Sequence, residues 1–161
     1  DDAKPLVAEV GILKGSGLAT WSELFPGYSV HGFDIDLSNT QANLPSLRAK
    51  GAFKQSEPSL HAFNQLTCNS STVANAASGK YVFVVDDGMH TIDTMLRTFQ
   101  AFRPHLAKGA VYVMEDAPCV NDRKLCLNMS SDLLHSMGTG YKIEVCPEAP
   151  LLWMVTEAEW S

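Results

Sequence analysis

Short apolar runs recur along the chain, separated by longer polar or amphipathic stretches. Six such runs cover residues 6–10, 29–33, 81–85, 110–114, 141–145 and 151–155, and each has the length of a β-strand. The third and fourth runs are apolar nearly throughout, which is typical of central strands covered on both faces by helices. A weaker strand at residues 52–54 is expected to be the seventh.

The stretches between these runs predict helices, and the clearest covers residues 91–106. Its apolar side chains fall on one stripe at helical spacing, made of Ile92, Met95, Leu96, Phe99, Phe102 and Leu106. Thr91 suits the N-cap of this helix, and Gly109 follows its predicted end.

The order of strands and helices predicts the topology. Alternating strands and helices form a parallel sheet with right-handed crossovers. The last two strands are separated only by residues 146–150, too few for a crossover helix, so they should pair as an antiparallel hairpin. We expect one Rossmann-like α/β domain over residues 1–161, a doubly wound seven-stranded sheet that is mostly parallel with a C-terminal antiparallel hairpin. Because the chain opens almost directly on its first strand, this domain is expected to be a piece of a longer protein.

Composition and charge narrow the classes of partner. The formal net charge of -6 argues against nucleic acid, because binding a phosphate backbone needs a basic surface. The cysteines form no CxxC pair and are too sparse for a disulfide scaffold, so free thiols are expected at Cys68, Cys119, Cys126 and Cys146. No signal peptide, transmembrane run or lipidation motif is visible, so we expect a cytoplasmic protein without membrane contacts.

A glycine-rich loop follows the first strand. Glu9 precedes Gly11, Gly15 and Gly17 in a G-x-x-x-G-x-G spacing, and a helix should begin near Leu18. Glycines let the backbone turn sharply and approach a ligand closely at the carboxyl edge of the sheet. The spacing differs from the G-x-G-x-x-G of dinucleotide enzymes and therefore disfavours a dinucleotide oxidoreductase.

The second strand ends in a pair of acidic residues. Asp34 stands about 20 residues beyond the glycine loop, where an acid can accept both ribose hydroxyls of an adenosine. The alternative is that acids here only cap the following helix, a role that suits Asp36 or Ser38.

Carboxylates also gather at the ends of the fourth and fifth strands. Asp86 and Asp87 follow one strand, and Glu115 and Asp116 follow the other. If these strands are neighbours, four negative charges meet at one edge, which is unfavourable unless protons or a cation compensate. Mg²⁺ or another divalent cation with oxygen ligands is the natural compensator, although any one of these acids could be a helix cap instead.

These motifs resemble a known family. E-V-G-x-x-x-G-S at residues 9–16 and G-F-D-I-D at residues 32–36 are similar to class I S-adenosylmethionine-dependent methyltransferases. The resemblance implies that Glu9, Gly11, Gly15 and Asp34 bind S-adenosyl-L-methionine. Such enzymes often place an Asp beside the adenine after the third strand, whereas this chain has Gln55, which we expect to replace it.

A narrower resemblance concerns the acidic residues. YVFVVDDGMH at residues 81–90 and FQAFRPHLAKGAVYVMED at residues 99–116 are similar to metal-dependent macrolide sugar O-methyltransferases and to the related cephalosporin hydroxylases. This resemblance makes Asp87, Glu115 and Asp116 metal ligands, with Asp86 as an alternative to Asp87, and His90 the catalytic base beside Asp87. An imidazole takes up protons near neutral pH and so suits that role.

The resemblance implies an S-adenosylmethionine-dependent, Mg-assisted O-methyltransferase of natural product biosynthesis, acting on a small hydroxylated sugar, polyketide or phenol. Members of this group usually carry helices before the first strand that cover the substrate. A homo-oligomer or an additional domain is therefore expected to supply a lid. Two alternatives remain, a non-catalytic or partner-dependent S-adenosylmethionine-binding domain of a larger assembly and a hydroxylase of the cephalosporin hydroxylase type.

Overall fold

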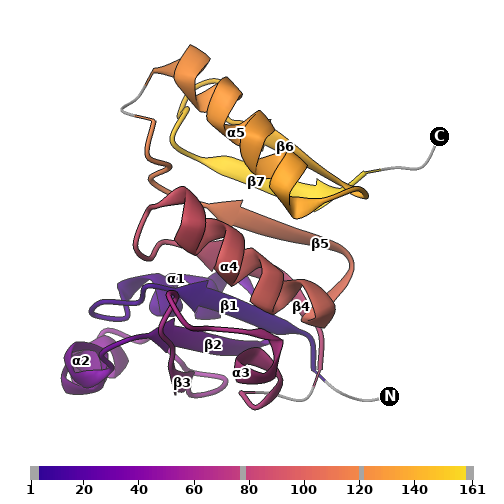
Figure 1. Cartoon of the computed structure of the whole chain (residues 1–161). Helices are drawn as coiled ribbons and strands as arrows, with labels where there is room; N and C mark the ends of the chain where they lie inside the picture. The colour runs from indigo at the N-terminus through magenta and orange to yellow at the C-terminus, as the bar shows by residue number, and fades with distance from the viewer. Residues whose placement is uncertain (1–3, 77–78, 120–121, 159–161) are drawn as a thin grey trace.

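The strands of the chain form one seven-stranded sheet. The computed structural model describes residues 4–76, 79–119 and 122–158. The strands are β1 (Leu6–Val10), β2 (Ser29–Asp34), β3 (Ser59–Ala62), β4 (Tyr81–Asp86), β5 (Leu106–Met114), β6 (Tyr141–Val145) and β7 (Trp153–Glu157). Their order in the sheet is β3-β2-β1-β4-β5-β7-β6 (Figure 1). The first five strands are parallel, and β7 is antiparallel to both β5 and β6, which confirms the predicted fold class and the C-terminal hairpin.

Helices cover both faces of the sheet, and a hydrophobic cluster lies under each layer of helices. Helices α1 (Ser16–Leu24) and α2 (Ser38–Ala49) pack around Leu18 and Val30 over one side of the sheet. Helices α3 (Ser70–Ala74), α4 (Ile92–Phe102) and α5 (Arg123–Met137) cover the other face (Figure 1). Phe99 and Trp153 belong to the larger cluster beneath them. None of the described helices is long and apolar enough to cross a membrane.

Helix α4 begins as predicted and ends earlier. Thr91 is its N-cap, and its side chain forms a capping box with Thr94. The helix stops at Phe102, and a 3-10 turn, Arg103–His105, leads straight into β5. Pro104 is the physical reason, because proline has no N–H to donate to a carbonyl group of the preceding helical turn. Gly109, predicted to follow the helix, lies instead inside β5 with a φ of 74°, at a register irregularity opposite β4.

The predicted strand at residues 52–54 is wrong. These residues form a turn after α2 in which Phe53 has a φ of 61°, and the third strand lies at Ser59–Ala62. Phe53 is buried in the cluster beneath α1 and α2. Phe53 is therefore apolar because it packs at the end of a helix, and its apolar character resembled that of a short strand.

The expectation of four free thiols is also wrong. Cys119 and Cys126 form a disulfide between the loop after β5 and the first turns of α5. Both residues are fully buried, whereas Cys68 and Cys146 are free. The pairing depends on how the loop folds back against the helix, and a spacing of 7 residues cannot reveal it.

The strand order reverses between β1 and β4, which are neighbours although β2 and β3 lie between them in the chain. In open α/β sheets, ligands bind in the crevice outside the carboxyl ends of the strands at such a switch point.

Candidate active site

The glycine loop after β1 lies against the loop after β4. Gly11 has a φ of 85°, and its N–H donates to the carbonyl of Phe33 at 2.8 Å. A Cβ at Gly11 would overlap the backbone of Asp87. Glycine is therefore needed at residue 11 for both its backbone conformation and this close approach.

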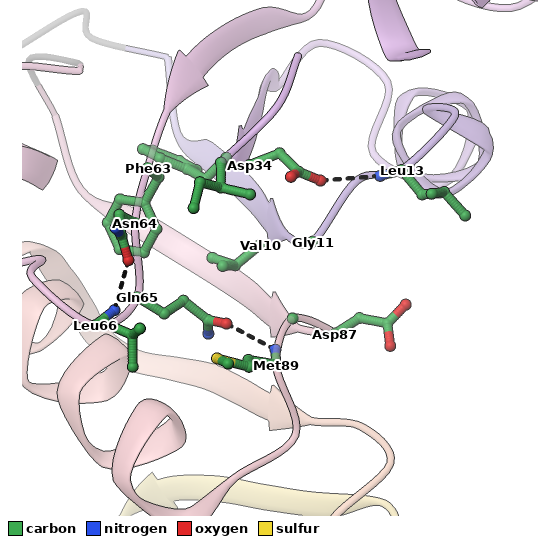
Figure 2. A pocket seen from close by; sticks show the side chains of 13 residues that line it. Val10, Gly11, Leu13, Asp34, Phe63, Asn64, Gln65, Leu66, Asp87 and Met89 are labelled. Carbon is green, nitrogen blue, oxygen red and sulfur yellow. Dashed lines mark hydrogen bonds between the residues drawn. The ribbon is translucent and has the colours of Figure 1, made fainter. Parts of the chain in front are cut away.

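Asp34 lies at the end of β2 beside this loop, as the sequence predicts. Its Oδ2 accepts hydrogen bonds from the N–H groups of Ile12 at 2.9 Å and Leu13 at 3.1 Å, and the second of these is drawn in Figure 2. Its Oδ1 accepts a longer one, 3.2 Å, from Asp36 N–H. The N-cap position of α2 is Leu37, and Asp36 Oδ1 accepts from Ser38 N–H at 2.9 Å, so Asp36 supports the start of that helix.

A cavity of about 510 Å³ opens at this edge of the sheet. That volume is within the usual range of small-molecule sites, about 300 to 1,000 Å³. Its lining comes from the ends of four strands, with Gly11 after β1, Asp34 from β2, Asn64 after β3 and Asp87 after β4 (Figure 2).

Gln55 is not among the residues that line this cavity; it is exposed in the loop before β3. The wall on that side is made by residues 63–66, which follow the true third strand. Asn64 is the polar residue that sequence reasoning missed there. The signal was present in the short strand pattern after Pro58, which ends in polar Asn64 and Gln65.

Glu9, near the end of β1, is buried against Gly17, with 6% of its surface exposed. Burial, and then the negative charges of Asp87 and Glu115, raise the pKa of its carboxyl group to about 8. Among the described residues, Glu9 Oε2 has no hydrogen-bond partner. With this raised pKa the group is mostly protonated at neutral pH, and a cation or a hydrogen-bond donor placed beside Oε2 would favour its charged form.

Asp87, His90 and Asp116 form a group whose potential ligand atoms all lie within 4.8 Å of one another. Two backbone hydrogen bonds extend the strand pairing beyond the strand ends and bring these residues together. Asp87 N–H donates to the carbonyl of Val10 in β1, and Glu115 N–H donates to the carbonyl of Asp86 in β4. His90 and Asp116 have φ values of 52° and 48°, a conformation that is rare for residues other than glycine.

The histidine ring has a defined orientation in this group. His90 Nδ1 lies 3.2 Å from the carbonyl oxygen of Glu115, which can only accept, so Nδ1 carries the proton. Nε2 then presents its lone pair 3.8 Å from Asp87 Oδ1. This nitrogen is free to take a proton or to bind a cation.

The other two predicted acids lie differently. Glu115 falls outside the three-residue group, although its half-buried carboxyl group has a raised pKa because of burial and then of Asp87 and Asp116. Asp86 is buried and points away from the group, accepting hydrogen bonds from Gln65 and Tyr112. Burial raises the pKa of Asp86 to about 7. Of the two adjacent acids, it is therefore Asp87 that faces the cavity.

Burial also raises the pKa of Asp87, and the neighbouring Asp116 adds to that effect while His90 opposes it. Crowded carboxylates of this kind favour a bound cation, and their oxygen atoms are the ligands that Mg²⁺ prefers. The residues present therefore fit a divalent metal ion.

The strand order is that of the class I methyltransferase fold, and solved structures with this fold include methyltransferases with their cofactor bound. MycE methyltransferase from the mycinamycin biosynthetic pathway, in complex with Mg and S-adenosylhomocysteine, matches 96% of this chain and 45% of its own, with a TM-score of 0.67 and 17% identity. The O-methyltransferase TomG from Streptomyces achromogenes, in complex with S-adenosylmethionine, matches 96% of this chain and 73% of its own, with a TM-score of 0.68 and 13% identity.

In sequence, the chain is 31% identical over 102 residues to L-olivosyl-oleandolide 3-O-methyltransferase of Streptomyces antibioticus. The aligned region is 63% of this chain and 23% of that relative, so the chain matches less than a quarter of the relative's length. No protein-family model matches the chain.

Proposed function

We propose that this chain binds S-adenosylmethionine in the cavity and, with a divalent cation beside it, transfers the methyl group to a hydroxyl of a small natural product. One observation carries the proposal: Asp87 belongs both to the cavity lining and to the group with His90 and Asp116. A cofactor site and a metal site would thus share a wall, as in-line methyl transfer to an oriented oxygen requires.

The described residues fit the two ends of the cofactor. Asp34 Oδ1 makes only the longer contact to Asp36 N–H and can accept from ribose hydroxyl groups. Asn64 offers a side-chain amide on the cavity wall for a nucleobase, in place of Gln55. The unpartnered Oε2 of Glu9, whose carboxyl group lies against Gly17 of the glycine loop, suits the ammonium group of the amino-acid end.

Asp87 and Asp116 would hold the cation, with Glu115 adding negative charge beside them. When bound, such an ion orients an acceptor hydroxyl and makes it more acidic. His90 Nε2 takes the proton of that hydroxyl, since Nδ1 is already used in the contact to Glu115. Asp87 faces the resulting imidazolium and stabilises its charge.

The names of the relatives support one class of acceptor. One is named for methylation of an olivosyl sugar on oleandolide, and MycE has been solved in complex with Mg, S-adenosylhomocysteine and mycinamycin VI. We propose a sugar hydroxyl on a macrolide or a similar hydroxylated product as the acceptor.

The test is transfer of labelled methyl from S-adenosylmethionine to L-olivosyl-oleandolide in the presence of Mg²⁺. EDTA should abolish product formation and excess Mg²⁺ should restore it. Turnover that is unaffected by EDTA would remove the metal from the mechanism.

A second candidate is a domain that binds the cofactor but needs a partner for turnover. Exposed apolar side chains surround the cavity mouth, with Ile35 at 71% and Leu13 at 67% exposure, joined by Leu66 and Met89. Apolar surface of this kind is typical of a site that another segment or subunit covers. Binding of S-adenosylhomocysteine without any methyl transfer would favour this candidate.

A further inference from the structure

Gln65 is a buried polar side chain between the cavity wall and the loop that carries Asp87 and His90. We infer that Gln65 is a positioning residue, which links the cofactor cavity to the metal-binding loop. The inference rests on the proposed function, because it assigns Gln65 a role in connecting the two proposed ligand sites.

The Gln65 side chain makes hydrogen bonds to three different segments of the chain. Its Oε1 accepts from Met89 N–H at 2.7 Å, a contact visible in Figure 2. Its Nε2 donates to Asp86 Oδ1 at 2.7 Å and to Thr98 Oγ1 at 2.8 Å. Only a primary amide of this length supplies one acceptor and two donors in this arrangement.

The contact with the loop is steric as well as polar. A Cβ at Gly88 would overlap the Gln65 carboxamide, so the amide packs directly on the loop backbone between Asp87 and Met89. Two residues further on, His90 has a left-handed φ of 52°. Such a conformation persists only when its surroundings hold it, and the Gln65 contacts are part of those surroundings.

The same side chain connects three strand ends. Asp86, which Gln65 holds, also accepts from the Tyr112 hydroxyl at 3.2 Å, and Tyr112 lies in β5, the strand that leads to Asp116. Gln65 itself follows β3 and lines the cavity. A ligand that presses on residues 64–66 therefore contacts the residue that holds the loop of the other site.

A purely structural role makes a different prediction. If Gln65 only satisfies buried Asp86, its loss should lower stability without a selective effect on metal binding. Partners in the shell around metal ligands typically change metal affinity by about 10- to 100-fold when they are removed. Energetic coupling between two sites is the measurement that separates the two cases.

The experiment compares Gln65→Met with Thr98→Val. The first removes all three hydrogen bonds at nearly constant volume, whereas the second removes only the one to α4 and serves as the matched control. Mn²⁺ affinity is measured from the electron paramagnetic resonance signal of the free ion, with and without S-adenosylhomocysteine. Calorimetry gives the affinity for S-adenosylhomocysteine.

We expect S-adenosylhomocysteine to strengthen Mn²⁺ binding by at least about 5-fold in the wild type and in Thr98→Val. In Gln65→Met, Mn²⁺ binding should weaken about tenfold and the strengthening by S-adenosylhomocysteine should disappear. Gln65→Glu, which keeps the shape and the acceptor for Met89 N–H but repels Asp86, should also weaken Mn²⁺ binding and replaces Gln65→Met if that variant does not fold.

Wild-type Mn²⁺ affinity and coupling in a folded Gln65 variant would overturn the inference and leave the proposed function intact. An equal loss of Mn²⁺ affinity in Thr98→Val and in Gln65→Met would likewise overturn the inference and leave the proposed function intact. A wild-type protein that binds neither S-adenosylhomocysteine nor Mn²⁺ would overturn the proposed function and this inference together.

Discussion

Asp34 shows how one residue is shared between the fold and the proposed ligand. Its Oδ2 holds the glycine loop through Ile12 and Leu13. Oδ1, which accepts the longer hydrogen bond from Asp36 N–H, is the oxygen proposed for a ribose hydroxyl. Sequence reasoning could place this acid because it follows a strand at a fixed distance from the loop. The hydrogen bonds to the loop depend on side-chain geometry and could not be predicted.

Replacing Asp34 with alanine should weaken S-adenosylhomocysteine binding by about 1.5 to 3 kcal/mol, the usual loss for hydrogen bonds to a charged group. Isothermal calorimetry measures this change. Asp36→Ala is the matched control, because Asp36 is exposed and supports only the start of α2. Equal affinities in the wild type and Asp34→Ala would show that another group holds the ribose.

His90→Ala should reduce methyl transfer by roughly 10²- to 10⁴-fold, the scale for losing a positioned general base. Single-turnover kinetics with L-olivosyl-oleandolide measure the chemical step, and affinity for S-adenosylhomocysteine should be retained. His135→Ala, which changes an exposed residue on α5, is the control. A His90 variant with full activity would exclude this histidine as the base.

The sequence could predict part of this acidic site. Asp87 and Asp116 follow the fourth and fifth strands, and the carboxyl ends of adjacent parallel strands meet. The group contains His90 but not Glu115. This arrangement depends on the left-handed φ of His90 and Asp116. Residue type does not reveal such a conformation outside glycine.

At the scale of the elements, periodicity predicted where helices and strands lie better than where they end. The apolar stripe of α4 continues in the sequence to Leu106, but Pro104 ends the helix before that residue. Phe53 produced a false strand signal because a buried aromatic residue in a turn has the same pattern as one in a short strand. Both errors arise because local pattern reports burial and not backbone conformation.

The Cys119–Cys126 disulfide should stabilise the junction between β5 and α5. For a closed loop of this size, the loss of chain entropy in the unfolded state corresponds to about 2 to 3 kcal/mol. Cys126→Ser should lower the free energy of unfolding by that amount in urea titrations without reductant. Cys146→Ser is the control because Cys146 has a free thiol, and equal effects of the two substitutions would contradict the prediction.

At the scale of the whole molecule, the sheet order was predictable as a class, because alternating strands and helices leave few right-handed topologies. Side-chain contacts between neighbouring strands away from this edge were not predictable. One example is the pair of stacked rings on β2 and β3, in which His31 Nδ1 lies 2.9 Å from His61 Nε2. Nothing in the spacing of these two residues indicates a contact.

This pair makes stability depend on pH. Burial, and then the neighbouring His61, lower the pKa of His31 to about 4, below its ordinary value of 6.5. The unfolded chain therefore binds more protons between these values, so the contribution is complete above pH 6.5 and is lost as the pH falls toward 4. Urea unfolding from pH 4.5 to 8 should show that His31→Gln flattens this part of the curve.

Comparison of His31→Gln with the wild type isolates the histidine from buried acids such as Glu9, whose raised pKa changes stability in the opposite direction. The difference in slope between the two proteins should vanish above pH 7. Parallel curves over the whole range would show that His31 is not the group responsible.

The proposed function depends above all on whether the cavity beside the glycine loop is a cofactor site. Titration of the protein with S-adenosylhomocysteine in an isothermal calorimeter tests it most directly, because binding needs neither the acceptor nor turnover. We expect saturable one-to-one binding and a higher melting temperature at ligand concentrations well above the dissociation constant. No heat of binding at millimolar S-adenosylhomocysteine would contradict it.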